Sequence, residues 1–401
     1  MKITDLRCMV INDLRALLVR VDTDEGISGI AQIEMSKHAY LKPHVLFYRP
    51  YILGQDPTNV ERIMLRIRHF GAFKPWGSSV SAIEMALWDI AGKAAGVPVY
   101  KLLGGKIRDK VRAYAGGDRG PRLDGNTPPD YFRNASERKK TPMGFTLFKW
   151  GVGFHSQMSL EVPNYHYGEQ PLEPRLPYLY ARGHLTDGGL KHTVACVKAL
   201  REGLGDELGL ALDCGPGWTV SSAIRFAKAV EPYNVMWLED LITGDYTPYT
   251  LPEAYREVTR CTSTPIHTGE EVYLRQGFQG LIETHAVNIV GPDPCDVGGI
   301  AELKWIAEYA DLHGILIAPH GIGDGPIGLA ALIQVTSTLP QNYIAFEFPV
   351  IDPKWQGLVK GLPDPVVREG FVEVQDRPGM GVELDEKSVR KVLKEGETYF
   401  E

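Results

Sequence analysis

The sequence has no apolar run approaching the roughly 20 residues that a membrane-spanning helix needs, and its amino terminus lacks the long apolar core of a secretory signal. It has no Lys/Arg cluster, and its net charge of −7 argues against nucleic acid or an anionic membrane surface as a partner. Its five cysteines are scattered, with no Cys-x-x-Cys pair, which argues against a disulfide framework or a zinc site. These absences predict a cytoplasmic protein whose partner is a small molecule.

The first part of the chain reads as a small α+β unit. Residues up to about 35 form alternating segments separated by a "DEG" turn, which is typical of paired strands. The stretch "SSVSAIEMALWDIAGKAAG" (78–96) has a capping serine, apolar residues at helical spacing, and a stop signal in Gly96 and Pro98. We therefore expect an amino-terminal unit that ends near residue 110.

Eight short β-rich runs follow, and most of them precede an amphipathic helical segment. This alternation implies parallel strands, and eight at such spacing predict a closed barrel. A doubly wound sheet is the structural alternative, but no Gly-rich phosphate fingerprint follows an early strand. We expect three parts: residues 1–110, a barrel over 111–349, and a 350–401 segment that folds back onto the first unit. The runs are 111–117, 145–151, 208–214, 235–240, 264–270, 286–293, 315–321 and 343–349.

Polar or charged side chains stand at nearly every carboxyl end of these runs. That end of a barrel is where active sites are built, because accessible loops there stand on rigid strands. Successive runs should therefore bring these side chains together around one site. They are Lys149, Asp213, Glu239, Glu270, Asp293, His320 and Glu347.

Asp213, Glu239 and Glu270 would converge from three adjacent strands. Such crowding of negative charge is unfavourable unless a cation neutralises it, and an all-oxygen ligand set suits Mg²⁺. A lone acidic residue after a strand is more often a helix cap or a solvated loop residue. We assign that ordinary role to Asp240, Glu271 and Asp296, the last as the N-cap of the helix that follows it.

The motifs "ALDC", "WLED", "HTGEE", "GPDPCDVGGI", "IAPHG" and "FEFP", with the amino-terminal "SAIEMALWDIAGKAAGVPVYKLLGG", occur in this order over nearly the whole chain. In this respect the chain resembles the enolase superfamily, in its branch of mandelate racemases, muconate lactonizing enzymes and acid-sugar dehydratases. The resemblance implies an α/β fold: a modified TIM barrel, (β/α)7β, with an amino-terminal α+β capping domain that the carboxyl-terminal segment completes. It also implies that Asp213, Glu239 and Glu270 are Mg²⁺ ligands.

The resemblance further implies a reaction in which a proton next to a carboxylate is removed to give an enediolate. His320 and Asp293 match the family's base dyad, and Glu347 matches a group that hydrogen-bonds a substrate carboxylate. Lys149 matches the first lysine of a Lys-x-Lys pattern, where it would bind the substrate, but Gly151 replaces the second lysine. Gly215 likewise stands where galactonate-type dehydratases carry a catalytic histidine.

A single dyad without an opposing lysine favours dehydration of a sugar acid to a 2-keto-3-deoxy acid over racemization. Two alternatives stay open: a cycloisomerase of an anhydro-sugar acid or lactone, and a silent relative that binds a carboxylate. The acid that assists the leaving hydroxyl is either His320 itself or another group, and His155 is one candidate. Segments 34–50 and 70–79 are expected to set specificity, the long 154–184 stretch is expected to form a lid or mobile segment, and the protein is expected to be a homo-oligomer.

Overall fold

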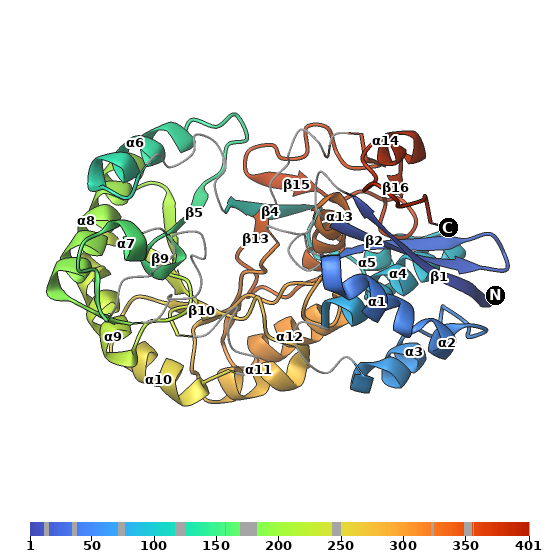
Figure 1. Ribbon diagram of the computed structural model, residues 1–401, viewed down its shortest axis with the longest axis horizontal. Helices are drawn as coiled ribbons and strands as arrows, with labels where there is room; N and C mark the ends of the chain where they lie inside the picture. Colours follow the sequence, from blue (N-terminus) through green and yellow to red (C-terminus); the bar gives the residue numbers. More distant parts are fainter. Residues whose placement is uncertain are drawn as a thin grey trace.

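The two largest sheets of the computed structural model are of different kinds, an antiparallel one at the amino terminus and a curled, mainly parallel one in the rest of the chain (Figure 1). It describes residues 1–401 except 12–15, 34–37, 71–76, 117–124, 157, 169–182, 243–249, 322–324, 349–354, 356 and 401. The predicted segments 34–50, 70–79 and 154–184 therefore lie partly outside the described residues. No helix in the described part of the chain is long and apolar enough to cross a membrane.

The amino-terminal unit is a three-stranded meander covered by a long helix, α4. A side chain at Gly29 in the third strand would lie 1.9 Å from the carbonyl oxygen of Ala86, so glycine permits the close approach of strand and helix. The predicted helix over 78–96 is confirmed as α4. The elements are β1 (Ile3–Ile11), β2 (Ala16–Thr23), β3 (Ser28–Ile33), α1 (His38–Phe47), α2 (Arg49–Ile52), α3 (Val60–Ile67), η1 (Arg68–Phe70), α4 (Gly77–Ala95) and α5 (Val99–Leu102).

All eight predicted β-rich runs contain a strand, and neighbours along the chain pair in parallel. The first and last strands, β4 and β13, pair with each other, and a parallel bridge between Ile317 and Tyr343 joins the seventh run to the eighth, so the sheet closes into a barrel. The strands are β4 (Lys110–Ala115), β5 (Leu147–Gly151), β8 (Gly209–Asp213), β9 (Val235–Glu239), β10 (Ile266–Thr268), β11 (Ile289–Val290), β12 (Leu316–Ile317) and β13 (Phe346–Phe348).

A helix follows each of the first seven barrel strands, which confirms the (β/α)7β prediction. Threonine caps begin several of these helices: Thr186 and Thr219 each accept a hydrogen bond from a backbone N–H of the first turn. The helices are α6 (Pro128–Arg138), α8 (Asp187–Leu204), α9 (Val220–Ala229), α10 (Pro252–Arg260), α11 (Leu274–Glu283), α12 (Ile300–Leu312) and α13 (Gly325–Thr336). Shorter elements in the connections are η2 (Gly153–His155), α7 (Met158–Glu161), β6 (His166–Tyr167), β7 (His184–Leu185) and η4 (Glu231–Tyr233).

The prediction that Asp296 caps α12 is wrong. The helix begins at Ile300, and Gly299 with a φ of 110° occupies the N-cap position. Asp296 instead accepts a hydrogen bond from Ser78 of α4. Two glycines between Asp296 and the helix lengthen the turn, so the aspartate cannot reach the first helical N–H groups.

The carboxyl-terminal segment returns to the amino-terminal unit, and both termini lie on the same side of the molecule (Figure 1). Leu393 bridges to Ile11, and Glu397 pairs with Lys42 at 2.5 Å. The expected completion of the capping domain is thus confirmed, while the division at residues 110 and 349 stays a prediction. The segment contains β14 (Val359–Lys360), β15 (Phe371–Glu373), β16 (Glu383–Leu384) and α14 (Glu386–Arg390).

Candidate active site

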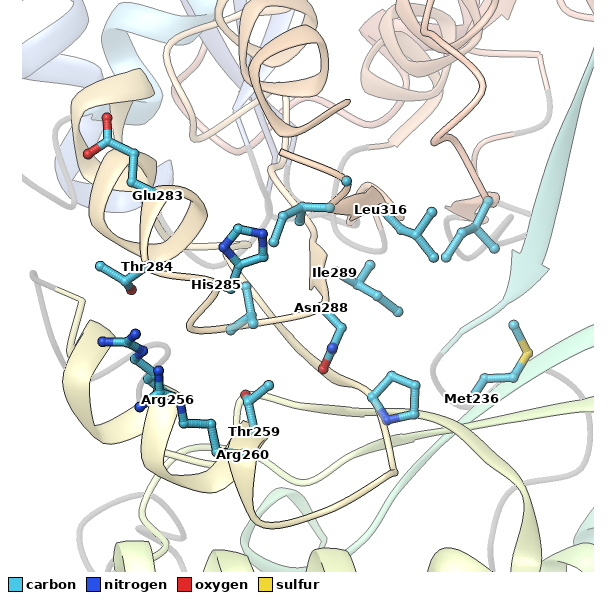
Figure 2. Close-up of a pocket in the computed structure, with 15 residues that line it drawn as sticks. Met236, Arg256, Thr259, Arg260, Glu283, Thr284, His285, Asn288, Ile289 and Leu316 are labelled. Carbon is cyan, nitrogen blue, oxygen red and sulfur yellow. The ribbon is translucent and has the colours of Figure 1, made fainter. Parts of the chain in front are cut away.

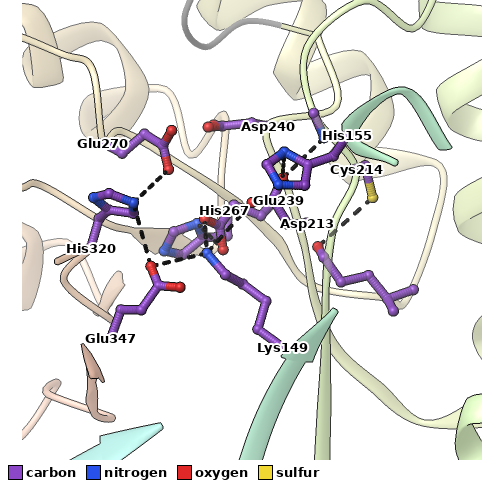
Figure 3. Close-up of polar contacts among 12 residues, drawn as sticks. Lys149, His155, Asp213, Cys214, Glu239, Asp240, His267, Glu270, His320 and Glu347 are labelled. Carbon is purple, nitrogen blue, oxygen red and sulfur yellow. Dashed lines mark hydrogen bonds and ion pairs between the residues drawn. The ribbon is translucent and has the colours of Figure 1, made fainter. Parts of the chain in front are cut away.

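The carboxyl ends of the barrel strands hold a group of buried charged side chains (Figure 3). Strand pairing sets Asp213 beside Glu239, and Glu239 beside His267. Because the strands are parallel and in register, their last residues reach the same edge. All seven residues singled out in the sequence lie there, on or just after β5, β8, β9, β10, β11, β12 and β13.

Lys149 lies at the centre of these charges. Its Nζ is 2.5 Å from Oε1 of Glu239, 3.2 Å from Oε2 of Glu347 and 3.6 Å from Oδ2 of Asp213. Burial by itself lowers the pKa of Lys149, but the surrounding carboxylates outweigh burial and raise it well above its ordinary value. Conversely, burial raises the pKa of Glu239, but Lys149 and His267 outweigh that effect and hold it at about 2.

His320 and Asp293 form a second group at the same edge. Nδ1 of His320 lies 2.6 Å from Oδ2 of the fully buried Asp293, while Nε2 lies 3.5 Å from both Glu270 and Glu347. Burial by itself lowers the pKa of His320, yet these carboxylates raise it well above its ordinary value. Asp293 thus fixes the orientation of the imidazole, and Nε2 faces the other charged groups.

Glu239, Asp240 and Glu270 each offer a carboxylate oxygen within 4.8 Å of the others. Oxygens on opposite sides of an octahedral Mg²⁺ site lie about 4.2 Å apart, so these donors need only small movements to share one hard cation. The donor set therefore fits Mg²⁺. Asp213 lies outside this group and contacts Lys149 instead.

Asp240 belongs to this carboxylate group, although its position in the sequence indicates only a helix cap or a solvated loop residue. Its φ of 50° places it in the left-handed region, and this turn directs its carboxylate to the same edge as that of Glu239. Oγ1 of Thr268 donates a hydrogen bond to Asp240 at 2.5 Å. An adjacent pair of acids after a buried strand was the available signal, but alternation along a strand predicts that neighbours face opposite sides.

His267 was also missed, although a histidine inside a buried strand was an available signal. Its ring is fully buried and stacks on the Trp237 ring, with the ring centroids 5.4 Å apart. Its Nε2 lies 3.1 Å from the carbonyl oxygen of Ala318. Its Nδ1 lies 3.5 Å from Glu239, which also accepts a hydrogen bond from the Trp237 indole at 3.0 Å. His267 and Trp237 thus hold Glu239 from inside the barrel.

His155, in η2, lies on the opposite side of the cluster from His320 (Figure 3). Its Nδ1 is 3.2 Å from Oδ1 of Asp213. A Cβ at Gly151 would lie 2.7 Å from its ring, and one at Gly215 would lie 2.6 Å from its backbone nitrogen. The two glycines that depart from the lysine and histidine patterns therefore make the space that His155 occupies.

The two carboxylate oxygens of Glu347 differ in their contacts with other side chains. Oε2 contacts Lys149 and His320, whereas Oε1 is buried and has no hydrogen-bond partner among the described residues. An unpaired buried oxygen costs free energy, and native structures keep few of them. Oε1 is thus available to a bound molecule.

Comparison with known proteins identifies the family of the chain. Residues 133–388 match the family described as Enolase C-terminal domain-like, and residues 7–104 match the Mandelate racemase / muconate lactonizing enzyme N-terminal domain. The chain is 33% identical to the D-xylonate dehydratase of Haloferax volcanii, over 100% of this chain and 91% of that protein. It is 30% identical to a D-galactonate dehydratase family member of Pseudarthrobacter chlorophenolicus, over 92% and 90% of the two chains.

Solved structures show the same relationship. A mandelate racemase/muconate lactonizing enzyme-like protein of Rubrobacter xylanophilus is 33% identical, with a TM-score of 0.83 over 100% of this chain and 99% of that one. A member of the enolase superfamily from Salmonella Typhimurium is 26% identical, with a TM-score of 0.81 over 97% and 98%. The chain is thus an enzyme of the enolase superfamily and belongs to its mandelate racemase/muconate lactonizing enzyme branch.

Proposed function

We propose that this enzyme is a Mg²⁺-dependent hydro-lyase that dehydrates a sugar acid to a 2-keto-3-deoxy acid. The observation that carries the proposal is the His320–Asp293 pair, which faces a cluster of carboxylates able to hold a hard cation. The relatives named as D-xylonate and D-galactonate dehydratases support the same class of substrate.

His320 is the general base in this proposal. With Nδ1 bound to Asp293, Nε2 is the nitrogen that takes the proton next to the substrate carboxylate, once a cation on Glu270 offsets the negative charge that raises the pKa of His320. A positioned base contributes on the order of 10²–10⁴-fold to the rate. The proton that the departing hydroxyl needs comes from His320 on the same face or from His155 on the other.

Lys149 and Glu347 bind the substrate carboxylate. The Lys149 ammonium supplies positive charge, and the unpaired Oε1 of Glu347 hydrogen-bonds a carboxylate oxygen. Both groups are fully or almost fully buried, so their contacts with substrate would form away from bulk water, where they are strong.

Glu239 and Glu270 are two metal ligands in this proposal, and Asp213 is the third. Asp240 is the competing third ligand, because its carboxylate belongs to the 4.8 Å group. When bound, Mg²⁺ would stabilise the negative charge that develops on the substrate carboxylate.

Gly151 is the feature that favours dehydration. A racemase of this branch would carry a second basic side chain there, but glycine leaves His155 in that space. Nδ1 of His155 is 3.2 Å from Oδ1 of Asp213, and His155 can act as the acid for the leaving hydroxyl.

A screen of mono- and diacid sugars with Mg²⁺ tests the proposal. The expected result is turnover of at least one sugar acid to a product that has lost one water. A product of unchanged mass would indicate cycloisomerization or epimerization instead. Absence of metal-dependent turnover on the whole panel would overturn the proposal.

A further inference from the structure

The helix that follows Asp293 in the chain is capped by the other domain. Oε2 of Glu84, in α4, accepts a hydrogen bond from the N–H of Ile300 at 2.8 Å, and Oε1 accepts one from Ala301 at 2.9 Å. Helix α12 has no side-chain cap from its own chain neighbours, so a carboxylate from α4 satisfies its first N–H groups. Glu84 itself is fully buried.

Glycine makes this approach possible. Gly299 has a φ of 110°, and a Cβ at this position would lie 2.0 Å from Oε2 of Glu84. Any other residue would both strain the backbone and push the carboxylate away. Glycine at position 299 therefore lets the Glu84 carboxylate reach the N–H groups at the start of α12.

Two further side chains of α4 hold the same turn. Oγ of Ser81 accepts a hydrogen bond from the N–H of Gly298 at 2.9 Å, and Ser78 donates one to the Asp296 carboxylate. Ser78, Ser81 and Glu84 are three residues apart, so they share one face of the helix. This face contacts the backbone or side chains of residues 296–301 at four points.

The turn begins at Asp293. Oδ1 of Asp293 accepts a hydrogen bond from the N–H of Cys295 at 2.7 Å. The carbonyl oxygen of Asp293 accepts one from the N–H of Val297 at 2.7 Å. Its other carboxylate oxygen contacts His320 at 2.6 Å. Hydrogen bonds at both ends of the short backbone segment 293–301 thus connect α4 to the imidazole.

We propose that Glu84 is a positioning residue for the His320–Asp293 pair, acting from the capping domain through residues 293–301. This inference rests on the proposed function, in which His320 is the base. A base must lie within hydrogen-bond reach of the proton that it takes, and a displacement of about 1 Å costs about 100-fold in rate. Loss of the Glu84 contacts would release the turn that holds Asp293.

The test compares Glu84→Gln with Asp89→Asn. Asp89 is on the same helix, is fully buried, and accepts backbone N–H groups of Ile30 and Met380 at 3.1 and 2.8 Å, but does not contact residues 293–301. Each variant exchanges one acceptor oxygen for an amide NH2, so each should lose stability. Only Glu84→Gln should lower kcat, by about 10- to 100-fold, with KM changed less than about 3-fold.

A double-mutant cycle with Asp293→Asn separates positioning from general loosening. If Glu84 acts through Asp293, adding Glu84→Gln to Asp293→Asn should lower kcat by less than about 2-fold further. Ser81→Ala, which removes one hydroxyl, is the milder variant if Glu84→Gln does not fold, and it should lower kcat by a smaller factor in the same direction.

Equal kcat in Glu84→Gln and Asp89→Asn, or full additivity in the cycle, would overturn the positioning role and leave the proposed function standing. Unchanged kcat in Ser81→Ala would also count against the positioning role where Glu84→Gln cannot be measured. Absence of turnover by the wild type would overturn both, so the two failures are distinguishable.

Discussion

The two ends of the barrel use polar side chains differently. At the carboxyl end, Lys149 is buried and forms ion pairs with the buried Glu239 and Glu347. At the amino end, a cavity of about 770 Å³ is lined by helix and strand ends that include Arg256, Arg260 and His285 (Figure 2). This pocket lies at the end of the barrel opposite to the cluster of buried charges.

Polar side chains at the amino end bind the protein's own main chain. Thr259 donates to the carbonyl oxygen of Ala286 at 2.6 Å, and Oδ1 of Asn288 accepts the N–H of Ile266 at 2.9 Å. Such bonds join adjacent segments and contribute about 1 kcal/mol each. They stabilise the barrel.

Buried charges at the carboxyl end carry a cost that the fold does not require. Desolvation of an ion pair often exceeds its attraction, and apolar residues of similar size are frequently as stable. Groups with strongly perturbed pKa values in one cluster are therefore candidates for function. The following experiments test whether the two ends differ in this way.

The largest expected effect comes from His320→Asn. Loss of the base should lower turnover by about 10²- to 10⁴-fold, because an asparagine amide on Asp293 cannot take the proton that the His320 imidazole takes. Calorimetry should show Mg²⁺ binding nearly unchanged. The matched variant at the amino end is His285→Asn, whose φ of 52° asparagine tolerates, and it should keep turnover. Retained activity in His320→Asn would remove the base assignment.

The second largest effect is expected on the affinity for Mg²⁺. Glu239→Gln is expected to weaken Mg²⁺ binding more than about 10-fold, measured by isothermal titration calorimetry. Asp213→Asn and Asp240→Asn then decide the third ligand, because only the true ligand should weaken binding to a similar degree. Unchanged affinity in Glu239→Gln would argue against the whole carboxylate set.

Lys149→Met tests the charge balance of the metal-free protein. Breaking a buried pair by removing one partner costs about 3–5 kcal/mol, so urea unfolding with a chelator present should show a loss in this range. Bound Mg²⁺ should recover part of that loss, since it supplies the missing positive charge. Equal loss with and without metal would show that Lys149 acts only by packing.

The same pair predicts a pH dependence. The pKa of Glu239 is about 2 in the folded protein against an ordinary 4.5, so its stabilisation is present above about pH 4.5 and is lost as pH falls toward 2. Wild-type stability should therefore drop over this range. In Lys149→Met the drop should be smaller, as the free energy of unfolding at successive pH values would show.

The smallest effect is expected at the amino end. Arg260 is exposed, so Arg260→Ala should leave turnover unchanged and alter stability by no more than about 0.5 kcal/mol. A large loss of activity would mean that the two ends are functionally connected. That result would contradict a division of roles between the two ends of the barrel.

Local patterns in the sequence were sufficient for much of the site. Alternation of strands and helices predicted the barrel, and charged residues at the ends of the runs predicted which side chains meet. Asp213, Glu239, Glu270 and the other predicted residues do lie at one edge, because parallel strands share the direction of the chain. Asp240 escaped this reasoning because its position depends on a left-handed backbone conformation that no alternation rule foresees.

What the sequence by itself determined is the order of the elements and the set of side chains at the carboxyl edge, since both follow from short-range periodicity. Only the tertiary structure decided that Glu84 rather than Asp296 caps α12, because that bond joins residues 216 positions apart. It also decided that His155 occupies the space above Gly151 and Gly215. Contacts between distant segments depend on how domains pack, and no local pattern specifies that packing.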